Sequence, residues 1–549
     1  MWLINTTTIQ LERVDADRLT STPYAILSHT WDEDEVAFED MMEPGRAEQR
    51  QGYVKIESTC RLAKQQGLAY AWIDTCCIDK RSSAELAEAI NSMYRWYKCS
   101  RVCYAHLEDL EPHQGREEDT LHSLPSCRWF TRGWTLQELI ASDNIEFYGR
   151  EWQYRGTKAK LRHQISDITG IDIAVLENNA LLESIPIAKR MSWAANRQTT
   201  RVEDTAYCLL GIFDVNMPMM YGEGAKAFAR LQEEIVKEST DLSLFAWKVQ
   251  KGSENPLQAF RGILAQSPAE FAHCRHLRKA PSMRYGFEFA MTNKGLRIEA
   301  ILGQRDNKDY LWDLACMIPN DDGENSRIGV FLTKTADGYV RTRPAELYET
   351  DDTSVWSGPR RKIFLRKRVT GYASWNLKSL LDMNLAVRFS INGGFRLHSF
   401  AAKPTDLWDP LHHCFITGNS EQFTGFLDFT ISDLSNSFTT SRIFVVCGLT
   451  INPDSGPLRT LRPWMATYDS QDTAGSEKII VGINGYYNSY GEENFLHLIR
   501  DRVLAREVDM QHEISVPSSD ATERLYISLG APQGTDDGAY TLSVNIVNR

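Results

Sequence analysis

The segment from Gly67 to Lys80 reads GLAYAWIDTCCIDK, and it decides the fold of the N-terminal part of this 549-residue chain. Residues 68–73 form a nearly continuous apolar run, which is typical of a strand buried on both faces of a parallel sheet. The run ends at Asp74, where a polar turn begins. A buried strand followed by a polar turn is one unit of a strand–helix–strand series, so further units are expected on either side.

Strand and helix patterns alternate around this segment. Residues 54–66 carry apolar side chains at helical spacing, and Ser82 or Ser83 can cap a second helix. In that helix the apolar residues are Leu86, Ile90, Met93 and Tyr97. Another helical segment covers residues 134–141, and further strands are predicted at residues 24–28, 101–107 and 145–148. This alternation predicts an α/β domain over residues 1–150, with a parallel sheet covered by helices.

The rest of the chain changes character twice. Residues 151–250 read as a mainly helical segment, in which residues 224–238 place Phe228, Leu231 and Ile235 on one apolar stripe. Residues 251–549 read as an all-β C-terminal domain, most simply a sandwich, with turn signals such as Ala336-Asp337-Gly338. The strands expected there are residues 286–292, 362–369, 385–391, 425–431, 442–449, 478–483, 524–529 and 540–547. Residues 470–477, SQDTAGSE, are expected to form a mobile loop.

Composition and charge narrow the classes of function. Lys and Arg total 61 while Asp and Glu total 73, so the net charge is −12. This charge disfavours non-specific binding to nucleic acid or to an anionic membrane, because both need a positive field. No apolar run approaches the roughly 20 residues that span a bilayer, and the N-terminal residues lack the pattern of a secretory signal. The 11 cysteines are scattered and odd in number, which is typical of reduced thiols, so a cytoplasmic protein is expected.

Polar side chains gather where the predicted strands end. In an open parallel sheet, ligands bind beyond the carboxyl ends of the strands. The residues at those ends are Ser28, His29 and Trp31 after the first strand, Asp74 after the second, and Glu108 and Asp109 after the third. Arg132, Trp134 and Glu138 follow at the next helix, where residues four apart share a face. A carboxylate beside an indole in a partly dry cleft can have a raised pKa and act on developing positive charge.

Plainer interpretations compete with these roles. Trp134 can be a core residue with Glu138 as its solvated neighbour, and Asp74 can simply cap the turn that follows it. Successive residues on a strand point to opposite faces, which disfavours a catalytic pair of Ser28 and His29. Each of these residues therefore has a structural alternative to its functional role.

Two other kinds of site are disfavoured by spacing. The adjacent thiols of Cys76 and Cys77 do not match the ligand spacing of a zinc site, so no metal site is predicted. The fragment Gly222-Glu-Gly224 is too short for a phosphate loop, and no G-x-x-x-x-G-K-[ST] motif occurs. A nucleotide triphosphatase is therefore not expected.

Several long sequence blocks resemble the fungal heterokaryon-incompatibility (HET) domain. They are YAILSHTW (24–31), GLAYAWIDTCCIDK (67–80), INSMYRWYKCSRVCYAHLEDL (90–110) and RWFTRGWTLQELIAS (128–142). Residues 190–235, which begin RMSWAANRQ, resemble the segment that follows this domain in many such proteins. The resemblance covers roughly the first 250 residues, and the β-rich remainder is similar to the C-terminal region of some HET proteins.

The resemblance implies a role in the cell death that follows fusion of genetically different hyphae. The HET domain is in turn similar to TIR domains, which have the flavodoxin-like strand order, and many of which cleave NAD⁺ with a glutamate in a W-x-x-x-E pattern. Trp134-Thr-Leu-Gln-Glu138 matches that pattern. The segment over residues 111–125 and the loop TCCIDK depart from the TIR pattern.

If the resemblance holds, Glu138 stabilises the oxocarbenium-like state in which the nicotinamide–ribose bond breaks. NAD⁺ is then the substrate, and no cofactor is expected. Ser28 and Arg132 would hold phosphate, Trp31 or Trp134 would stack on a ring of the dinucleotide, and Asp74 would bind a ribose hydroxyl. The substrate-binding residues expected are Ser28, His29, Trp31, Asp74, Arg132 and Trp134. This hypothesis requires Glu138 to face a crevice wide enough for a dinucleotide.

The competing hypothesis is a non-enzymatic module that signals by self-association. Trp31, Trp72, Trp96 and Trp134 would then be core or interface aromatics. A third hypothesis is hydrolysis of another nucleotide, or of nucleic acid, in the same cleft. The expected partners are a second copy of the chain and an upstream sensor of non-self. The β-rich region is expected to restrain the first domain or to present it to a partner.

Overall fold

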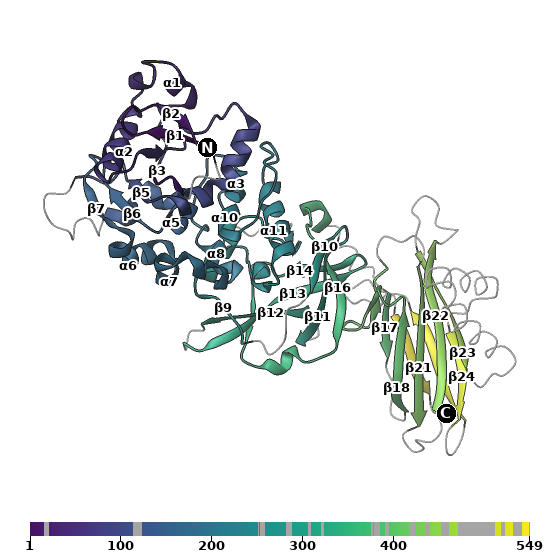
Figure 1. The fold of residues 1–549 in the computed structure, drawn as a ribbon. Coiled ribbons are helices and arrows are strands. Elements are labelled where there is room, and N and C mark those ends of the chain that lie inside the picture. The colour runs from purple at the N-terminus through teal and green to yellow at the C-terminus, as the bar shows by residue number, and fades with distance from the viewer. Residues whose placement is uncertain are drawn as a thin grey trace.

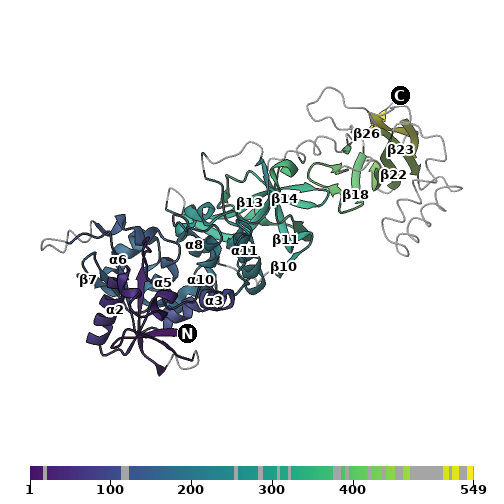
Figure 2. The same cartoon turned by 90° about the horizontal axis from the view of Figure 1, so that it is seen from above.

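The chain forms three bodies in a row (Figures 1 and 2). An α/β unit that holds the N-terminus is followed by a helical segment packed on a first β body, and a second β body holds the C-terminal strands. This computed structural model describes residues 1–15, 21–112, 123–250, 252, 258–281, 288–305, 309–319, 323–374, 377, 385–389, 395–417, 423–433, 440–451, 461–469, 511–517, 522–530 and 541–547.

The α/β unit is built on a seven-stranded sheet in the order β2-β1-β4-β3-β5-β6-β7. Its strands are β1 (Trp2–Asn5), β2 (Leu11–Arg13), β3 (Tyr24–His29), β4 (Tyr70–Trp72), β5 (Val102–His106), β6 (Ile145–Tyr148) and β7 (Tyr154–Thr157). Strands β3 to β6 are parallel, and they lie in the order β4-β3-β5-β6. The sheet is mixed, where the sequence predicted a parallel one, because the hairpin β1–β2 and strand β7 add antiparallel edges.

The helices of this unit agree with the sequence pattern. They are α1 (Phe38–Met42), α2 (Tyr53–Gln65), α3 (Ser83–Cys99) and α5 (Thr135–Ala141), with short 3-10 turns η2 (Ala47–Gln49), η3 (Leu124–Ser126) and η4 (Arg128–Thr131). Helix α3 begins where predicted, because the Ser82 side chain accepts a hydrogen bond from the backbone N–H of Glu85. Helix α2 packs on β3 and β4, and α5 packs on β3.

Residues 158–245 fold mainly as short helices. They are α6 (Lys158–Thr169), α7 (Ile173–Glu177), η5 (Asn179–Ser184), α8 (Ile187–Ser192), α9 (Asp204–Tyr207), α10 (Leu210–Phe213), α11 (Lys226–Glu238) and η6 (Leu242–Phe245). Phe228, Leu231 and Ile235 lie on the buried side of α11, as the apolar stripe predicts. Strand β7, although it follows residue 150, belongs to the first sheet.

The first β body is a closed ring of strands. Strands β11, β16, β14, β13 and β12 pair in that order, and β12 pairs again with β11. The elements are β8 (Phe260–Arg261), η8 (Pro268–His276), β9 (Arg278–Lys279), β10 (Phe289–Thr292), β11 (Gly295–Arg305), β12 (Asp309–Pro319), β13 (Asn325–Thr335), β14 (Gly338–Thr342), β15 (Tyr348–Thr350), η9 (Thr353–Trp356) and β16 (Arg360–Leu365). The predicted turn before Gly338 joins β13 to β14.

The second β body contains a six-stranded and a four-stranded sheet. Its strands are β17 (Leu385–Phe389), β18 (Phe395–Lys403), β19 (Trp408–Asp409), β20 (Cys414–Phe415), β21 (Phe423–Asp433), β22 (Thr440–Ile451), β23 (Leu461–Asp469), β24 (Gln511–Pro517), β25 (Thr522–Gly530) and β26 (Thr541–Val547). The C-terminal region is β-rich, as predicted, but the closed ring means that it is not one sandwich. The expected loop at 470–477 and strand at 478–483 lie outside the described residues.

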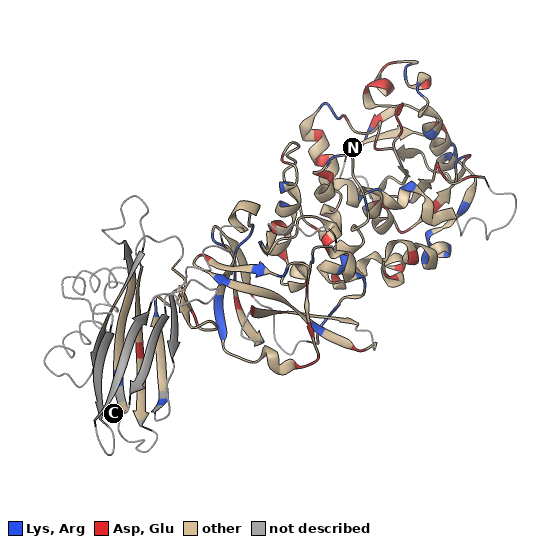
Figure 3. Cartoon of the chain, turned by 180° about the vertical axis from the view of Figure 1, so that it is seen from behind, with Lys and Arg blue, Asp and Glu red and all other residues tan. Residues whose placement is uncertain are grey.

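One hydrophobic core runs through the first two bodies. It extends from Leu3 in β1, through the helical segment, to Leu365 in β16, and it also includes Leu411 between β19 and β20. Acidic and basic residues are interspersed over these bodies (Figure 3). Among the described residues, none of the helices combines the length and the apolar character needed to cross a membrane.

Candidate functional site

The parallel strands bring polar side chains to one edge of the first sheet. Every residue of β3, YAILSH, is buried, so the strand forms the centre of the core until its apolar run stops at Ser28. The register pairs Ser28 with Ala105 and His29 with His106. Asp74 follows β4 at the same edge, where its carboxylate contacts His29. The polar residues after β3 and β4 are therefore adjacent in space.

Glu138 joins this edge from helix α5. Its side chain is buried, with 5% of the residue exposed. The Ser28 hydroxyl donates a hydrogen bond to Glu138 Oε2, and the indole N–H of Trp129 donates to Ser28 Oγ over 2.7 Å. The three side chains form a chain of hydrogen bonds from η4 through β3 to α5.

The environment of Glu138 favours its protonated form. Burial raises the pKa of its carboxyl to about 8, and the charge of Asp74 acts in the same direction. Hydrogen bonds with Ser28 and Tyr97 and the charge of Arg197 oppose this rise in pKa. The Tyr97 hydroxyl also contacts the carbonyl oxygen of Leu27, to which it donates over 3.0 Å.

The carboxyl group is enclosed in this conformation. Ser28 and Tyr97 contact it, and Trp129, which is 1% exposed, contacts Ser28. The sequence predicts that Glu138 borders a crevice wide enough for a dinucleotide, whereas in the structure Glu138 is only 5% exposed. A ligand could reach the carboxyl only after a movement of the residues around it.

Asp74 holds two of the expected substrate-binding side chains. Its Oδ1 lies 3.1 Å from His29 Nε2, and its Oδ2 accepts a hydrogen bond from the Trp31 indole over 2.9 Å. These contacts and the charge of Lys80 lower the pKa of Asp74, although burial acts in the opposite direction. Trp31 is 47% exposed and has the Lys80 ammonium 3.9 Å from its ring centroid, so it forms the exposed rim of the site.

A buried lysine neutralises the carboxylates beside this rim. Lys55 Nζ donates to Asp32 Oδ2 over 2.6 Å and to Glu35 Oε1 over 2.5 Å, and lies 3.6 Å from Glu108 Oε2. Burial and a hydrogen bond with Asp32 raise the pKa of Glu108. Burial would also raise the pKa of Asp32, but its contacts with Glu108 and Lys55 lower that pKa to about 2. Lys55 was not among the predicted site residues, because the apolar stripe of helix α2, in which it stands, does not indicate a buried cation.

Arg132 and Trp134 point elsewhere. Arg132 Nη1 donates to Thr200 Oγ1 over 3.3 Å, and the Trp134 side chain hydrogen-bonds Asp204. Both partners belong to the helical segment. The indole that hydrogen-bonds to Ser28 in the Glu138 network is Trp129, which was not among the predicted site residues although it stands in the same block, RWFTRGW.

The helical segment is locked to η4 and α5 through the backbone. Gly133 N–H donates to the Gln198 carbonyl over 2.8 Å, and Gln198 N–H donates to the Thr131 carbonyl over 2.7 Å. A Cβ atom at Gly133 would lie 2.5 Å from Thr199 Cγ2, so only glycine allows this close approach. The segment that follows the first domain is therefore part of the environment of the site.

The fragment Gly222-Glu-Gly224 has a structural role. The Glu203 carboxylate accepts hydrogen bonds from the N–H groups of Gly222 and Gly224, over 2.8 and 3.0 Å. The Glu223 side chain accepts a hydrogen bond from Tyr207 over 2.9 Å. These backbone donors are occupied within the protein, which agrees with the absence of a phosphate loop in the sequence.

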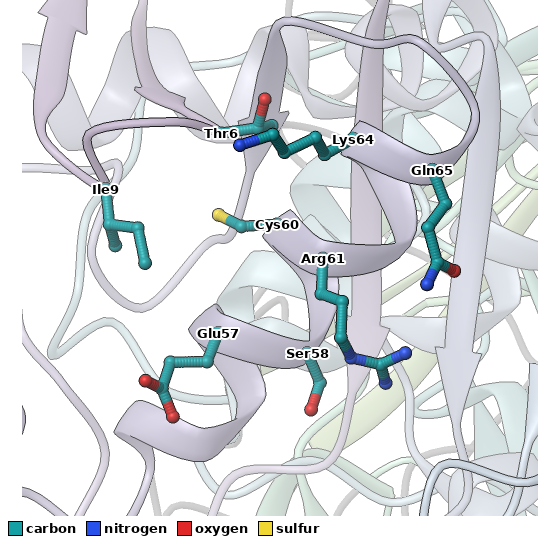
Figure 4. Close-up of a pocket in the computed structure, with 8 residues that line it drawn as sticks. All are labelled: Thr6, Ile9, Glu57, Ser58, Cys60, Arg61, Lys64 and Gln65. Carbon is teal, nitrogen blue, oxygen red and sulfur yellow. The ribbon is translucent and has the colours of Figure 1, made fainter.

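A separate open pocket of about 650 Å³ lies between the β1–β2 turn and helix α2 (Figure 4). Its lining residues are Thr6, Ile9, Glu57, Ser58, Cys60, Arg61, Lys64 and Gln65. Asn5 at the end of β1 pairs with Tyr70 at the start of β4, so this pocket lies at the opposite edge of the sheet from Ser28 and Glu138.

The first sheet and its helices form an α/β region with a mixed sheet, and a buried glutamate lies at the carboxyl ends of its parallel strands, where open α/β sheets bind ligands. Residues 24–121 match the family model described as Heterokaryon incompatibility protein (HET), so this part of the chain is similar to a HET domain. Residues 226–294 match a family described as Domain of unknown function (DUF8212). The chain is also similar to the vegetative incompatibility protein HET-E-1 of Podospora anserina, with 46% identity over 244 residues. The match covers 42% of this chain and 18% of that relative, and no solved structure matches the chain.

Proposed function

We propose that this protein acts in heterokaryon incompatibility, as an effector of the cell death that follows contact with non-self. The match to the HET family and the similarity to a vegetative incompatibility protein support this role. Because the chain spans less than a fifth of that relative's length, the role is carried over from the shared 244 residues alone.

The chemistry we propose is hydrolysis of NAD⁺ in the HET domain, and the buried Glu138 carboxyl at the strand tips carries this proposal. The bond between the ribose C1′ and the nicotinamide nitrogen breaks, and its electron pair neutralises the pyridinium ring. Water forms the new bond at C1′ and loses a proton, so the products are ADP-ribose, nicotinamide and H⁺. An ionised Glu138 would stabilise the positive charge that develops on the ribose in the transition state.

The neighbouring groups fit the binding of a ribose and a flat ring. Asp74 and His29 are a hydrogen-bonded pair at the strand tips that can bind ribose hydroxyls, and the exposed ring of Trp31 can stack on a base. Ser28 would break its hydrogen bond with Glu138 and contact the substrate instead. Arg132 and Trp134 have no role in this proposal, because their polar atoms pair with Thr200 and Asp204.

Activity would require the site to open. Trp129 covers Ser28 from the four-residue turn η4, so a movement of this turn would uncover the carboxyl group. A closed resting state suits a death effector, because an enzyme that consumes NAD⁺ continuously would kill its own cell. Clustering by a sensor, or association of several copies, would supply the trigger.

The test compares the purified wild-type protein with Glu138→Gln. Glutamine has nearly the same shape and can still accept the Ser28 hydrogen bond, so the variant should fold. We expect Glu138→Gln to lower the rate of NAD⁺ loss by a factor on the order of 10² to 10³. The matched control is Glu146→Gln, since Glu146 bonds Gln66 and Tyr148 at the other end of the sheet. Equal turnover in wild type and Glu138→Gln would remove Glu138 from the mechanism.

The enclosure of Glu138 also favours a second candidate function, a non-enzymatic module that signals by self-association. A carboxyl group that is fully covered and hydrogen-bonded can be a purely structural group. Under this hypothesis, cells that express the protein die with unchanged NAD⁺, and Glu138→Gln kills them as efficiently as wild type. Loss of NAD⁺ before loss of membrane integrity would instead favour the enzyme.

A further inference from the structure

Arg197 is a cation that the helical segment places beside helix α5. Its Nη1 donates to the Arg132 carbonyl over 2.8 Å and to Thr135 Oγ1 over 2.9 Å. Its Nε donates to the Trp193 carbonyl over 3.3 Å, which fixes the guanidinium within its own segment. These contacts hold the positive charge against the first turn of α5, the helix that carries Glu138.

The same contacts connect Arg197 to the hydrogen-bonded network of the site. Thr135 Oγ1, which accepts from Arg197, donates in turn to the carbonyl oxygen of Trp129 over 2.5 Å. The Trp129 indole then donates to Ser28, and Ser28 donates to Glu138. Arg197 therefore contacts helix α5 directly and is linked, through Thr135, to the Trp129 carbonyl in η4.

One donor of Arg197 is left over. Its Nη2 is shielded from solvent and has no hydrogen-bond partner among the described residues. A buried guanidinium N–H without an acceptor is costly, and a catalytic role nearby is one of the explanations for such a group in a native protein. The charge of Arg197 acts on Glu138, and the carboxylate acts back on Arg197.

We propose that Arg197 is a positioning residue of the Glu138 site, because its guanidinium supplies the positive charge that allows Glu138 to lose its proton when the site becomes active. This inference rests on the proposed function. It means that the site at the edge of the first sheet is completed by the helical segment; Glu138 and Arg197 both follow residues 24–121, the range of the family match. Arg197 acts through Glu138 and makes no contact with substrate.

The other charged groups around the site do not take this role. Lys55 is paired with Asp32 and Glu35, and Arg128 bonds Thr30 and Asp32 at the rim. The ionisable groups that face Glu138 are Asp74 from the end of β4, Tyr97 from α3, Cys103 from β5, Cys208 after α9, and Arg197. Arg197 is the cation in this set, and Asp74 opposes it.

The backbone links give this arrangement a route to regulation. Gln198 bonds Gly133 and Thr131, so a shift of residues 197–199 would move the guanidinium and η4 together. A partner that binds the helical segment could in this way alter both the cover of the site and the charge beneath it.

The test measures the protonation of Glu138 directly in the full-length protein. Infrared difference spectra against pH follow the carboxyl band, which is identified by its absence in Glu138→Gln. We expect Arg197→Met to move the titration midpoint upward by about one unit, the usual effect of losing a nearby opposite charge. Arg197→Gln, which keeps a donor for the Arg132 carbonyl, should show the same shift if the methionine variant does not fold. Arg197→Lys keeps the charge and should titrate close to wild type.

The matched control is Arg190→Met. Arg190 is a buried arginine of the same segment, but it donates to the Ile212 carbonyl over 2.9 Å and lies over Phe213, away from Glu138. Its loss should leave the midpoint of Glu138 unchanged. An unshifted midpoint in folded Arg197→Met or Arg197→Gln would overturn the proposal, as would an equal shift in Arg190→Met.

The pH profile of NAD⁺ cleavage is the second measurement. Below the midpoint, each unit of upward shift lowers the ionised fraction of Glu138 tenfold, so kcat of Arg197→Met should fall with it while KM changes little. If the wild-type protein cleaves no NAD⁺, the proposed function fails, yet the infrared titration still decides whether Arg197 controls the protonation of Glu138.

Discussion

Two buried charged clusters in this protein are built in opposite ways. At the junction between the helical segment and the closed β ring, Arg341 is 1% exposed and donates to the carbonyls of Phe245 and Trp247. Its guanidinium lies 3.8 Å from the Trp247 ring centroid, and Arg261, 4.8 Å from the same ring, pairs with Glu270 over 3.0 Å. Each guanidinium there has carbonyl acceptors or a carboxylate, although Arg341 Nε has no partner among the described residues and burial lowers the Arg341 pKa to about 9.

The strand-tip site holds a buried acid without a bonded cation. Glu138 is covered as thoroughly as Arg341, but its hydrogen-bond partners are hydroxyl groups, and burial raises its pKa. Arg341 stays charged at neutral pH despite its lowered pKa, whereas Glu138 changes its protonation state near neutral pH, and groups with such perturbed pKa values are common at functional sites. This difference indicates that the junction has a structural role, and that a catalytic role belongs to the residues at the strand tips.

The largest expected effect is the pH dependence of stability that Glu138 imposes. The pKa of Glu138 in the folded protein is about 8, above the unperturbed value of 4.5, so the folded state binds a proton that the unfolded state releases. The resulting stabilisation is fully present below pH 4.5 and is lost as the pH rises to about 8. We expect a loss on the order of 4 kcal/mol across that interval, measured as the free energy of urea unfolding at a series of pH values.

Glu138→Gln should remove this dependence. The amide cannot ionise, so the stability of the variant should exceed that of wild type increasingly toward high pH. Parallel stability curves for the two proteins would mean that Glu138 is already ionised in the folded state, and the contrast with Arg341 would disappear.

The second prediction concerns the junction. Arg341→Met leaves the buried carbonyls of Phe245 and Trp247 without donors, and we expect it to lower the free energy of unfolding by about 3 kcal/mol. The control is Arg343→Met, because Arg343 is 42% exposed in its ion pair with Asp309 and should cost less than about 1 kcal/mol. NAD⁺ cleavage by folded Arg341→Met should be unchanged; a loss of cleavage would show that the two clusters are coupled.

Much of the N-terminal fold was predictable because it follows from local patterns. The apolar run before Asp74, the cap at Ser82 and the strand at residues 145–148 each depend on a few neighbouring residues. The meeting of Ser28, Asp74 and Glu138 at one edge also followed, since parallel strands end together.

The remaining features depend on contacts between distant residues. Helical spacing placed Trp134 and Glu138 on one face, but Trp134 turns to Asp204, and Trp129 fills the position beside Ser28. The closed β ring required pairing of β11 with both β12 and β16, which no short pattern encodes. The shared core likewise makes a cut near residue 250 unsuitable for isolating the first domain, since it would expose Phe245 and the side chains around it.

A smaller effect is expected from the cover of the site. Trp129→Phe keeps an aromatic ring but removes the donor to Ser28 Oγ, which should cost about 1 to 2 kcal/mol in unfolding free energy. If the hydrogen bond keeps the site closed, the variant should cleave NAD⁺ faster than wild type at low protein concentration. The control is Trp72→Phe, which alters a buried indole whose N–H has no partner among the described residues. Faster cleavage in both variants would point to general loosening of the core and not to a specific cover.

The smallest effect is expected at the exposed rim. Lys80 lies over the half-exposed ring of Trp31, and cation–π contacts at exposed positions contribute about 0.5 to 1 kcal/mol, so Lys80→Met should change stability by less than about 1 kcal/mol. The lysine occupies the ring face on which a base would stack, and its removal should therefore lower KM for NAD⁺ with little change in kcat. Trp31→Leu should raise KM, because the stacking surface is lost while Asp74 and His29 remain. Unchanged KM in both variants would place the dinucleotide away from the rim and confine any chemistry to the closed network around Glu138.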